Sequence, residues 1–269
     1  MALIGTLGDL LWGTPAYEYG SRAYTSAVGL YLRTDPTYTL RTRGASAVFR
    51  PSTFVEWNSL QNRIWDEEAV LERVLKNIRE DDVFYDIGAT IGIYSCLVGN
   101  QLRTGTVVPF EPYPPNVERL RVNLAANDIV AEVETRPLAA ESRETEFYVY
   151  DTESPGAQHG SLDTVYPSGE PLTSFPVETV AGDRLVRENE IPAPTVVKMD
   201  VQGSGVNVLK GLRESLSSER CRLVYAEAHH NRDVLQTLLE SFGFTTETLA
   251  VSRTDKEPTI VAARTPTGD

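Results

Sequence analysis

Residues 82–94 read Asp-Val-Phe-Tyr-Asp-Ile-Gly-Ala-Thr-Ile-Gly-Ile-Tyr, and this stretch decides the fold. An apolar run, Val83–Tyr85, is followed by an acid, Asp86, and then by two glycines, Gly88 and Gly92, ahead of a helix-like segment. This order predicts a buried parallel strand, a tight turn and the start of a helix. In α/β proteins a nucleotide-like cofactor binds at such a turn. A plain strand-to-helix connection also uses glycines for its geometry alone.

Strand and helix patterns alternate from this stretch towards the end of the chain. Strands are predicted at 106–111, 131–137, 144–150, 195–201, 221–228, 244–251 and 259–263, and helices at 66–79 with Asp66 as the cap, 114–127, 181–189, 206–216 and 231–242. The alternation predicts an α/β domain over residues 66–269, with a largely parallel sheet and helices on both faces. Residues 1–65 are predicted to form an N-terminal extension or cap, whose scattered tyrosines pack on the main domain rather than line a substrate cleft.

The composition limits the classes of partner. The chain of 269 residues carries 38 acidic and 25 basic residues, which gives a net charge of −13. Such acidity argues against a nucleic-acid partner, because phosphate binding depends on Lys and Arg. No apolar run reaches the roughly 20 residues of a membrane span, and the start of the chain lacks the basic residues of a secretory signal, so we expect a cytoplasmic protein. Few lysines and many carboxylates also suggest adaptation to high salt, as in a halophile.

The acids fall where a parallel sheet binds ligands, at the carboxyl ends of its strands. Glu111 ends the second predicted strand, about 25 residues after Asp86, which is close to the offset that places a carboxylate on ribose hydroxyls. The glycine pattern is Gly-x-x-x-Gly rather than Gly-x-Gly-x-x-Gly. This difference favours a ligand that has a ribose but no diphosphate, such as S-adenosylmethionine. Asp86 would then hydrogen-bond the amino-acid end of that ligand, directly or through water.

Four motifs resemble those of FkbM-type methyltransferases. The run Asp86–Ser95 is similar to the Asp-Ile-Gly-Ala-Asn-Ile-Gly-x-Tyr-Ser motif of that family, and Phe110–Asn116, followed by Leu120 and Asn123, is similar to its second motif. Lys198–Gly203, with Val208–Leu212, resembles its Lys-Ile-Asp-Val-Glu-Gly motif, and Glu227-Ala-His229 resembles its closing strand end. The resemblance covers about residues 70–244. It implies a Rossmann-like class I methyltransferase fold with a mostly parallel seven-stranded sheet, and S-adenosylmethionine as cofactor.

The resemblance also implies site residues. The cofactor would contact Asp86, Gly88, Ala89, Thr90, Gly92, Tyr94, Glu111 and Pro112. The candidate catalytic residues are Asp200 as the first choice of base, His229 as the second, because its ordinary pKa suits proton transfer, and Lys198, which would orient Asp200 or lower the pKa of the acceptor hydroxyl. The alternative interpretations are a simple ion pair between Lys198 and Asp200 and an exposed turn at His229.

This sequence departs from the family pattern at three positions. Thr90 stands where the family has Asn, and Gln202 and Gly205 stand where it has two glutamates. A metal held by Asp200 and Glu227 is therefore disfavoured, and no metal ligands are assigned. The polar loop at 158–164 is a candidate lid or acceptor contact.

The function predicted from these features is methyl transfer to a hydroxyl of a sugar or another small hydroxylated molecule or glycan. Two alternatives stay open. One is a protein that binds S-adenosylmethionine without catalysing transfer, which the changes at Gln202 and Gly205 suggest. The other is a nicotinamide-dependent oxidoreductase, which the missing third glycine disfavours. For the oligomeric state, a homodimer with residues 1–65 as a dimerisation segment is one option.

Overall fold

The computed structural model describes residues 15–42, 44–150, 152–162, 170–229, 231–249 and 258–264. The side chains of residues 15–18 and 62–66 are outside this description. The predicted strand ending at 251 and the predicted lid at 158–164 are therefore described only as far as Leu249 and Leu162.

The described chain contains a six-stranded sheet in the order β10-β11-β9-β8-β3-β4. Its strands are β3 (Val83–Ile87), β4 (Thr106–Phe110), β8 (Val196–Met199), β9 (Leu223–Glu227), β10 (Thr245–Leu249) and β11 (Thr259–Ala263). The strands β4, β3, β8 and β9 are parallel, and β11 runs antiparallel to both β9 and β10. The predicted Rossmann-like architecture with a mostly parallel sheet is confirmed, and β10 and β11 form an antiparallel pair at one edge of the sheet.

The prediction of seven strands is wrong by one. Residues 131–137 do not form a strand; they contribute a single parallel bridge between Glu134 and Phe110, at the outer edge of β4. The Glu111 amide donates to the Glu134 carbonyl, and the Glu134 amide donates to the carbonyl of Pro109. Proline has no N–H group of its own to donate, so the sheet edge at Pro109 offers fewer ladder bonds to a seventh strand.

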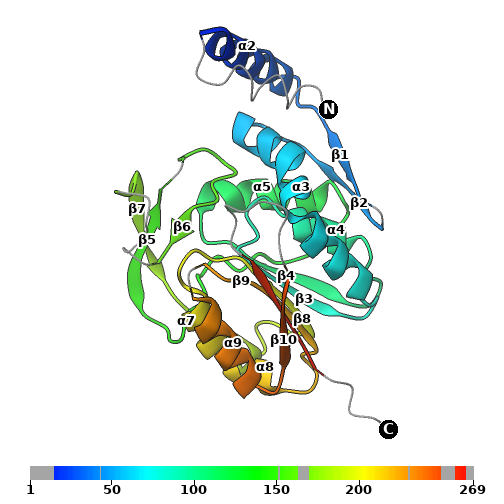
Figure 1. Cartoon of the computed structure of the whole chain (residues 1–269), viewed down its shortest axis with the longest axis vertical. Helices are drawn as coiled ribbons and strands as arrows, with labels where there is room; N and C mark the ends of the chain where they lie inside the picture. The colour runs from blue at the N-terminus through cyan, green and yellow to red at the C-terminus, as the bar shows by residue number, and fades with distance from the viewer. Residues whose placement is uncertain are drawn as a thin grey trace.

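Helices cover both faces of this sheet (Figure 1). One face carries α3 (Phe54–Asn77), α4 (Ile93–Gly99) and α5 (Pro114–Ala125), and the other carries α6 (Gly182–Arg187), α7 (Gly205–Gly211), α8 (Arg213–Ser217) and α9 (Arg232–Ser241). Successive residues of a strand point to opposite faces, so Phe84 joins the first core and Tyr85 the second. The helix predicted at 206–216 is divided into α7 and α8 at Leu212.

A second, three-stranded sheet lies beside the main one, on the left in Figure 1. It pairs β5 (Glu144–Val149) with both β6 (Gly160–Ser161) and β7 (Thr173–Glu178), antiparallel. The predicted strand at 144–150 exists, but it belongs to this sheet and not to the central one. Its Phe147 and Val149 pack with Tyr113 and Ala157 in a small separate core.

The N-terminal part of the described chain consists of α2 (Pro15–Leu32), a hairpin of β1 (Tyr38–Arg41) and β2 (Ser46–Phe49), and the start of α3. The prediction that Asp66 begins a helix is wrong, because α3 begins at Phe54 with Thr53 as its cap. Tyr24, Tyr31 and Tyr38 make ring contacts with Phe54 or Trp57 of α3. Aromatic packing is therefore the role of these three tyrosines, and none of them lines the cavity described below.

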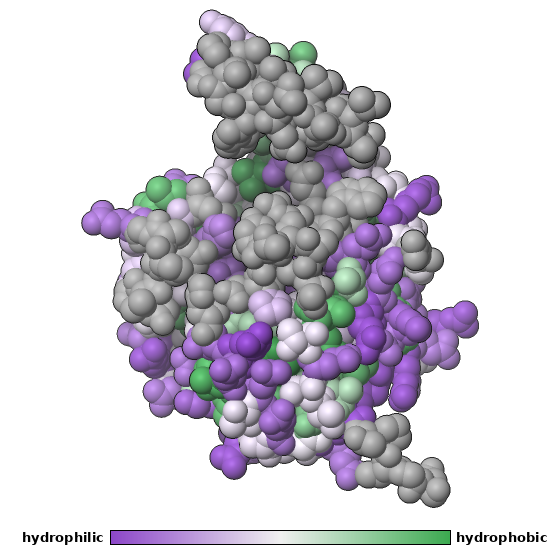
Figure 2. Space-filling view, viewed as in Figure 1, coloured by the Kyte–Doolittle hydropathy of each residue, from purple (hydrophilic) through white to green (hydrophobic). Residues whose placement is uncertain are grey.

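Hydrophilic residues cover most of the described surface on the face shown in Figure 2. Among the described residues, no helix is both long enough and apolar enough to cross a membrane.

Candidate active site

A cavity of about 330 Å³ opens at the carboxyl ends of the parallel strands. Its walls come from the turns after β3, β4, β8 and β9, and the segment 157–162 and strand β5 form the opposite side. A space of this size is typical of small-molecule sites, and its place at the sheet edge is the one where α/β folds bind ligands.

The glycine turn after β3 is shaped by close packing. A Cβ atom on Gly88, which has a φ of +80°, would lie 2.1 Å from the backbone oxygen of Asp200. A Cβ atom on Gly92, with a φ of +87°, would lie 2.5 Å from Cδ1 of Leu120 in α5. Gly88 therefore lets the ends of β3 and β8 approach each other, and Gly92 lets the turn pack on α5.

Thr90 sits in the same turn in a left-handed conformation, with a φ of +55°. Such a φ is a steric outlier for a β-branched residue, whereas Asn tolerates it. We expect Thr90→Asn to raise the free energy of unfolding by about 1 kcal/mol, measured by urea denaturation. Thr90→Val is the matched control, because it removes the hydroxyl but keeps the branched Cβ; equal gains in the two variants would contradict a backbone origin.

Asp86 holds the turn against the first turn of α4. Its Oδ2 accepts hydrogen bonds from the amide and the hydroxyl of Ser95, at 3.0 and 2.6 Å. Its Oδ1 is buried and accepts no hydrogen bond among the described residues, but it lies 3.8 Å from Nζ of Lys198. Asp86 is absent from the cavity wall, so its carboxylate positions the turn and Lys198 rather than facing the cavity directly.

Glu111 lines the cavity at the end of β4 and is 5% exposed. Its two carboxylate oxygens accept hydrogen bonds from the amides of Thr90 and Tyr113, at 2.8 and 2.9 Å. Burial raises the pKa of Glu111 from 4.5 to about 7, against the opposing effect of the two amide donors. A buried carboxylate fixed in this way can still accept hydrogen bonds from a pair of neighbouring hydroxyls.

This raised pKa predicts a pH dependence of stability. Because the folded protein binds the Glu111 proton more tightly than the unfolded chain, the stabilisation is complete below about pH 4.5 and is lost as the pH rises through about 7. We therefore expect the free energy of unfolding of the wild type to fall, relative to that of Glu111→Gln, between these two pH values. The measurement is urea denaturation of both proteins across this range, and parallel pH profiles would count against the raised pKa.

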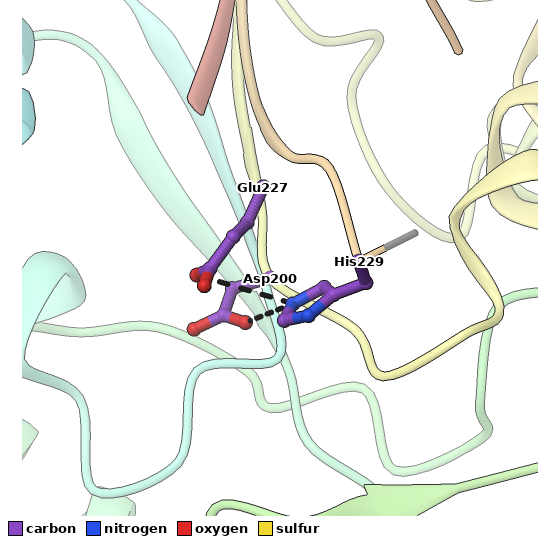
Figure 3. A group of neighbouring side chains, drawn as sticks. All are labelled: Asp200, Glu227 and His229. Carbon is purple, nitrogen blue, oxygen red and sulfur yellow. Dashed lines mark hydrogen bonds and ion pairs between the residues drawn. The ribbon is translucent and has the colours of Figure 1, made fainter. Parts of the chain in front are cut away.

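The candidate catalytic residues meet at the ends of β8 and β9. Oδ1 of Asp200 lies 3.0 Å from Nε2 of His229, and Oδ2 of Asp200 lies 3.7 Å from Nζ of Lys198. Glu227 approaches the same His229 nitrogen at 3.9 Å (Figure 3). His229 has a φ of +30°, a sparsely populated conformation of the kind that collects at functional sites.

Lys198 is buried and lies behind Asp200 rather than in the cavity. Its ammonium group is placed between the carboxylates of Asp86 and Asp200 and lies 4.8 Å from the centre of the Tyr94 ring. The ion pair between Lys198 and Asp200, which was the alternative interpretation of these two residues, is thus present. Lys198 holds Oδ2 of the Asp200 carboxylate, and His229 contacts Oδ1 of the same carboxylate.

The structure separates the predicted site residues into three groups. Those that line the cavity are Gly88, Thr90, Glu111, Pro112, Asp200 and His229. Ala89, Tyr94 and Lys198 line a smaller neighbouring pocket that shares Gly88 and Thr90 with the first, and Asp86 and Gly92 line neither of these two pockets.

The departures from the family pattern also differ in position. Gln202 lines the cavity. Gly205 does not, and a Cβ atom there would lie 3.2 Å from Cε of Met199 and 3.4 Å from Leu235. Of the two replaced glutamates, only the one at Gln202 therefore alters the chemistry of the cavity wall, where Thr90 also lies.

The lid predicted at 158–164 does contact the cavity, through its described residues 158–162. Ser161 donates to the Gln202 carbonyl at 2.8 Å, and Asn116 fixes the preceding loop through the Gly156 amide and the Ala157 carbonyl. Phe147 and Val149 also line the cavity and were not predicted, because the pairing of β5 with β6 and β7 depends on contacts distant in sequence. Asn116 lay in a recognised motif but was given no role.

Comparisons with known proteins identify the family of this chain. The model of the methyltransferase FkbM domain matches residues 86–253. The hexuronic acid methyltransferase AglP of Haloferax volcanii is 30% identical over 187 residues, which cover 70% of this chain and 73% of AglP. The 31-O-demethyl-FK506 methyltransferase FkbM of Streptomyces tacrolimicus is 29% identical over 62% of this chain and 74% of its own length.

Among solved structures, a methyltransferase FkbM from Methylobacillus flagellatus superposes with a TM-score of 0.48 at 18% identity, over 70% of this chain and 45% of that one.

Proposed function

Because the chain belongs to the FkbM methyltransferase family, we propose that it transfers the methyl group of S-adenosylmethionine to a hydroxyl oxygen of a sugar or another small hydroxylated molecule. The observation that supports this proposal best is that one cavity has Glu111 on one wall and the Asp200–His229 pair on another. The family membership gives no support to a nicotinamide-dependent oxidoreductase.

The residues present fit the cofactor. Its ribose diol would bind the buried carboxylate of Glu111, and the backbone of the turn at Gly88 and Thr90, with Pro112, would enclose the rest. Asp86 would act through water or through Lys198, because it does not line the cavity. When bound, the cofactor supplies a methyl group on a positively charged sulfur.

The chain's own residues would then handle the acceptor. We assign to Asp200 the role of base, because a carboxylate that is fixed on both sides can take the hydroxyl proton without reorienting. Lys198 and His229 position Asp200 from opposite sides. Gln202 and the segment 158–162 would contact the rest of the acceptor, and the relative that acts on hexuronic acid makes a uronic acid the first acceptor to test.

The test is a transfer assay with methyl-labelled S-adenosylmethionine and a panel of uronic acid glycosides and neutral sugars. We expect label in a hydroxylated acceptor and formation of S-adenosylhomocysteine. Calorimetric binding of S-adenosylhomocysteine without transfer to any acceptor would support the non-catalytic alternative. Absence of that binding would overturn the proposal altogether.

A further inference from the structure

We propose that Asp200, Glu227 and His229 form a binding site for a divalent cation that holds two neighbouring oxygens of the acceptor. One ligand atom from each of these three residues lies within 4.8 Å of the other two (Figure 3). They come from the ends of two adjacent parallel strands, and all three line the cavity. The inference rests on the proposed function for its chemistry.

The distances suit a six-coordinate cation. Ligands about 2.1 Å from such an ion lie about 3.0 Å apart when adjacent and about 4.2 Å apart when opposite. The His229 nitrogen is 3.0 Å from Asp200 and 3.9 Å from Glu227. Asp200 and His229 already have the spacing of adjacent positions, and Glu227 would take a third adjacent position by moving closer to both. The remaining three positions would be open to water and to the acceptor.

The balance of charge also favours a cation. Lys198 is shared between Asp86 and Asp200, at 3.8 and 3.7 Å. Oδ1 of Asp86 accepts no hydrogen bond among the described residues. The ammonium group of Lys198 is therefore the positive charge that balances the Asp86 carboxylate. A cation bound between Asp200 and Glu227, whose side chains are 10% and 21% exposed, would add positive charge where two carboxylates lie close together.

The donor set indicates the kind of cation. Two carboxylates and open positions for water or hydroxyl ligands suit Mg²⁺ and Mn²⁺, and the imidazole shifts the preference towards Mn²⁺. The sequence argued against a metal because two family glutamates are replaced. The structure brings in His229 as a third ligand, and Gly205 does not face the cavity.

A cation at this point would act on the acceptor in two ways. It would hold two vicinal hydroxyls, or a hydroxyl and the carboxylate of a uronic acid, as a chelate. It would also lower the pKa of the bound hydroxyl. The hydroxyl proton would pass to the carboxylate of Asp200, whose Oδ1 also holds the cation. The oxygen would then form its bond to the methyl carbon as the carbon–sulfur bond breaks.

The test measures binding without turnover. The full chain is stripped with a chelator and titrated with Mn²⁺ in the absence of cofactor and acceptor, and free Mn²⁺ is followed by electron paramagnetic resonance. We expect one site per chain, weakened at least about tenfold in Glu227→Gln and in His229→Gln. Glu118→Gln, at an exposed position on α5, is the matched control, and circular dichroism confirms that each variant is folded.

The outcomes separate this inference from the proposed function. No Mn²⁺ site in the wild type, or equal binding by Glu227→Gln and the control, would overturn the cation site. Methyl transfer that persists in the presence of chelator would then leave the proposed function intact. Conversely, Mn²⁺ binding that is lost in the variants, in a protein that methylates no acceptor, would support the site and overturn the proposed function.

Discussion

Asp200→Asn is expected to lower turnover about a thousandfold while changing the affinity for S-adenosylhomocysteine by less than about twofold, because a positioned general base contributes on the order of 10²- to 10⁴-fold. Asn preserves the size of the side chain and the contact with His229, but its amide cannot take up the acceptor proton. Transfer of labelled methyl groups gives the turnover, and calorimetry gives the affinity. Asp233→Asn, at an exposed residue of α9, makes the same chemical change outside the cavity.

His229→Gln tells the two candidate bases apart. If Asp200 is the base, loss of His229 removes a positioning contact and one ligand of the proposed cation but leaves the base in place, so turnover should fall less than in Asp200→Asn. A larger fall in His229→Gln would transfer the role of base to His229. Unchanged turnover in Asp200→Asn would remove Asp200 from the mechanism.

The parts of the site that could be predicted are those in which the chemistry is local in sequence. The strand, turn and helix around Asp86 are encoded within about a dozen residues, and Glu111 and Asp200 follow directly after apolar strands. Parallel strands bring such residues to one edge of the sheet, so their proximity followed from the alternation of strands and helices alone.

The parts that could not be predicted depend on contacts between distant segments. The wall formed by β5 requires Asn116 to fix the loop at Gly156, forty positions away. The missing seventh strand depends on the pairing of residues 131–137 with the edge of β4 at Pro109, where they make only the bridge between Glu134 and Phe110. The start of α3 is a different case, because it has a local signal in the sequence: Thr53 and Glu56 have the spacing of a capping box.

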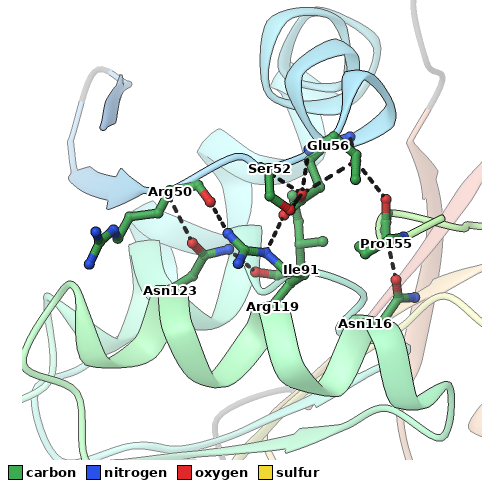
Figure 4. Close-up of polar contacts among 10 residues, drawn as sticks. Arg50, Ser52, Glu56, Ile91, Asn116, Arg119, Asn123 and Pro155 are labelled. Carbon is green, nitrogen blue, oxygen red and sulfur yellow. Dashed lines mark hydrogen bonds and ion pairs between the residues drawn. The ribbon is translucent and has the colours of Figure 1, made fainter. Parts of the chain in front are cut away.

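Glu56→Ala is expected to lower the free energy of unfolding by about 3–5 kcal/mol, because it removes the buried carboxylate of this capping box. Glu56 is fully buried and accepts hydrogen bonds from the amides of Ser52 and Thr53 at 2.8 and 3.0 Å (Figure 4). Its other oxygen lies 2.9 Å from Nε of Arg119, whose side chain is only 14% exposed. Alanine would leave this guanidinium largely buried without its carboxylate and would remove the Glu56 side-chain half of the capping box, while Thr53 remains the cap of α3.

Urea denaturation measures the loss, and Glu118→Ala, at an exposed position beside Arg119 on α5, should change stability by no more than about 0.5 kcal/mol. Adding Arg119→Ala to Glu56→Ala should cost less than the sum of the two single changes, because the second removes a charge that the first has stranded. A loss below about 1 kcal/mol in Glu56→Ala would mean that water replaces the carboxylate.

Thr53 also donates to the Pro155 carbonyl at 3.0 Å, beside the loop that leads into the cavity wall. The same variant should therefore raise the KM for the acceptor, because the segment before residue 66 supports the site as well as the fold.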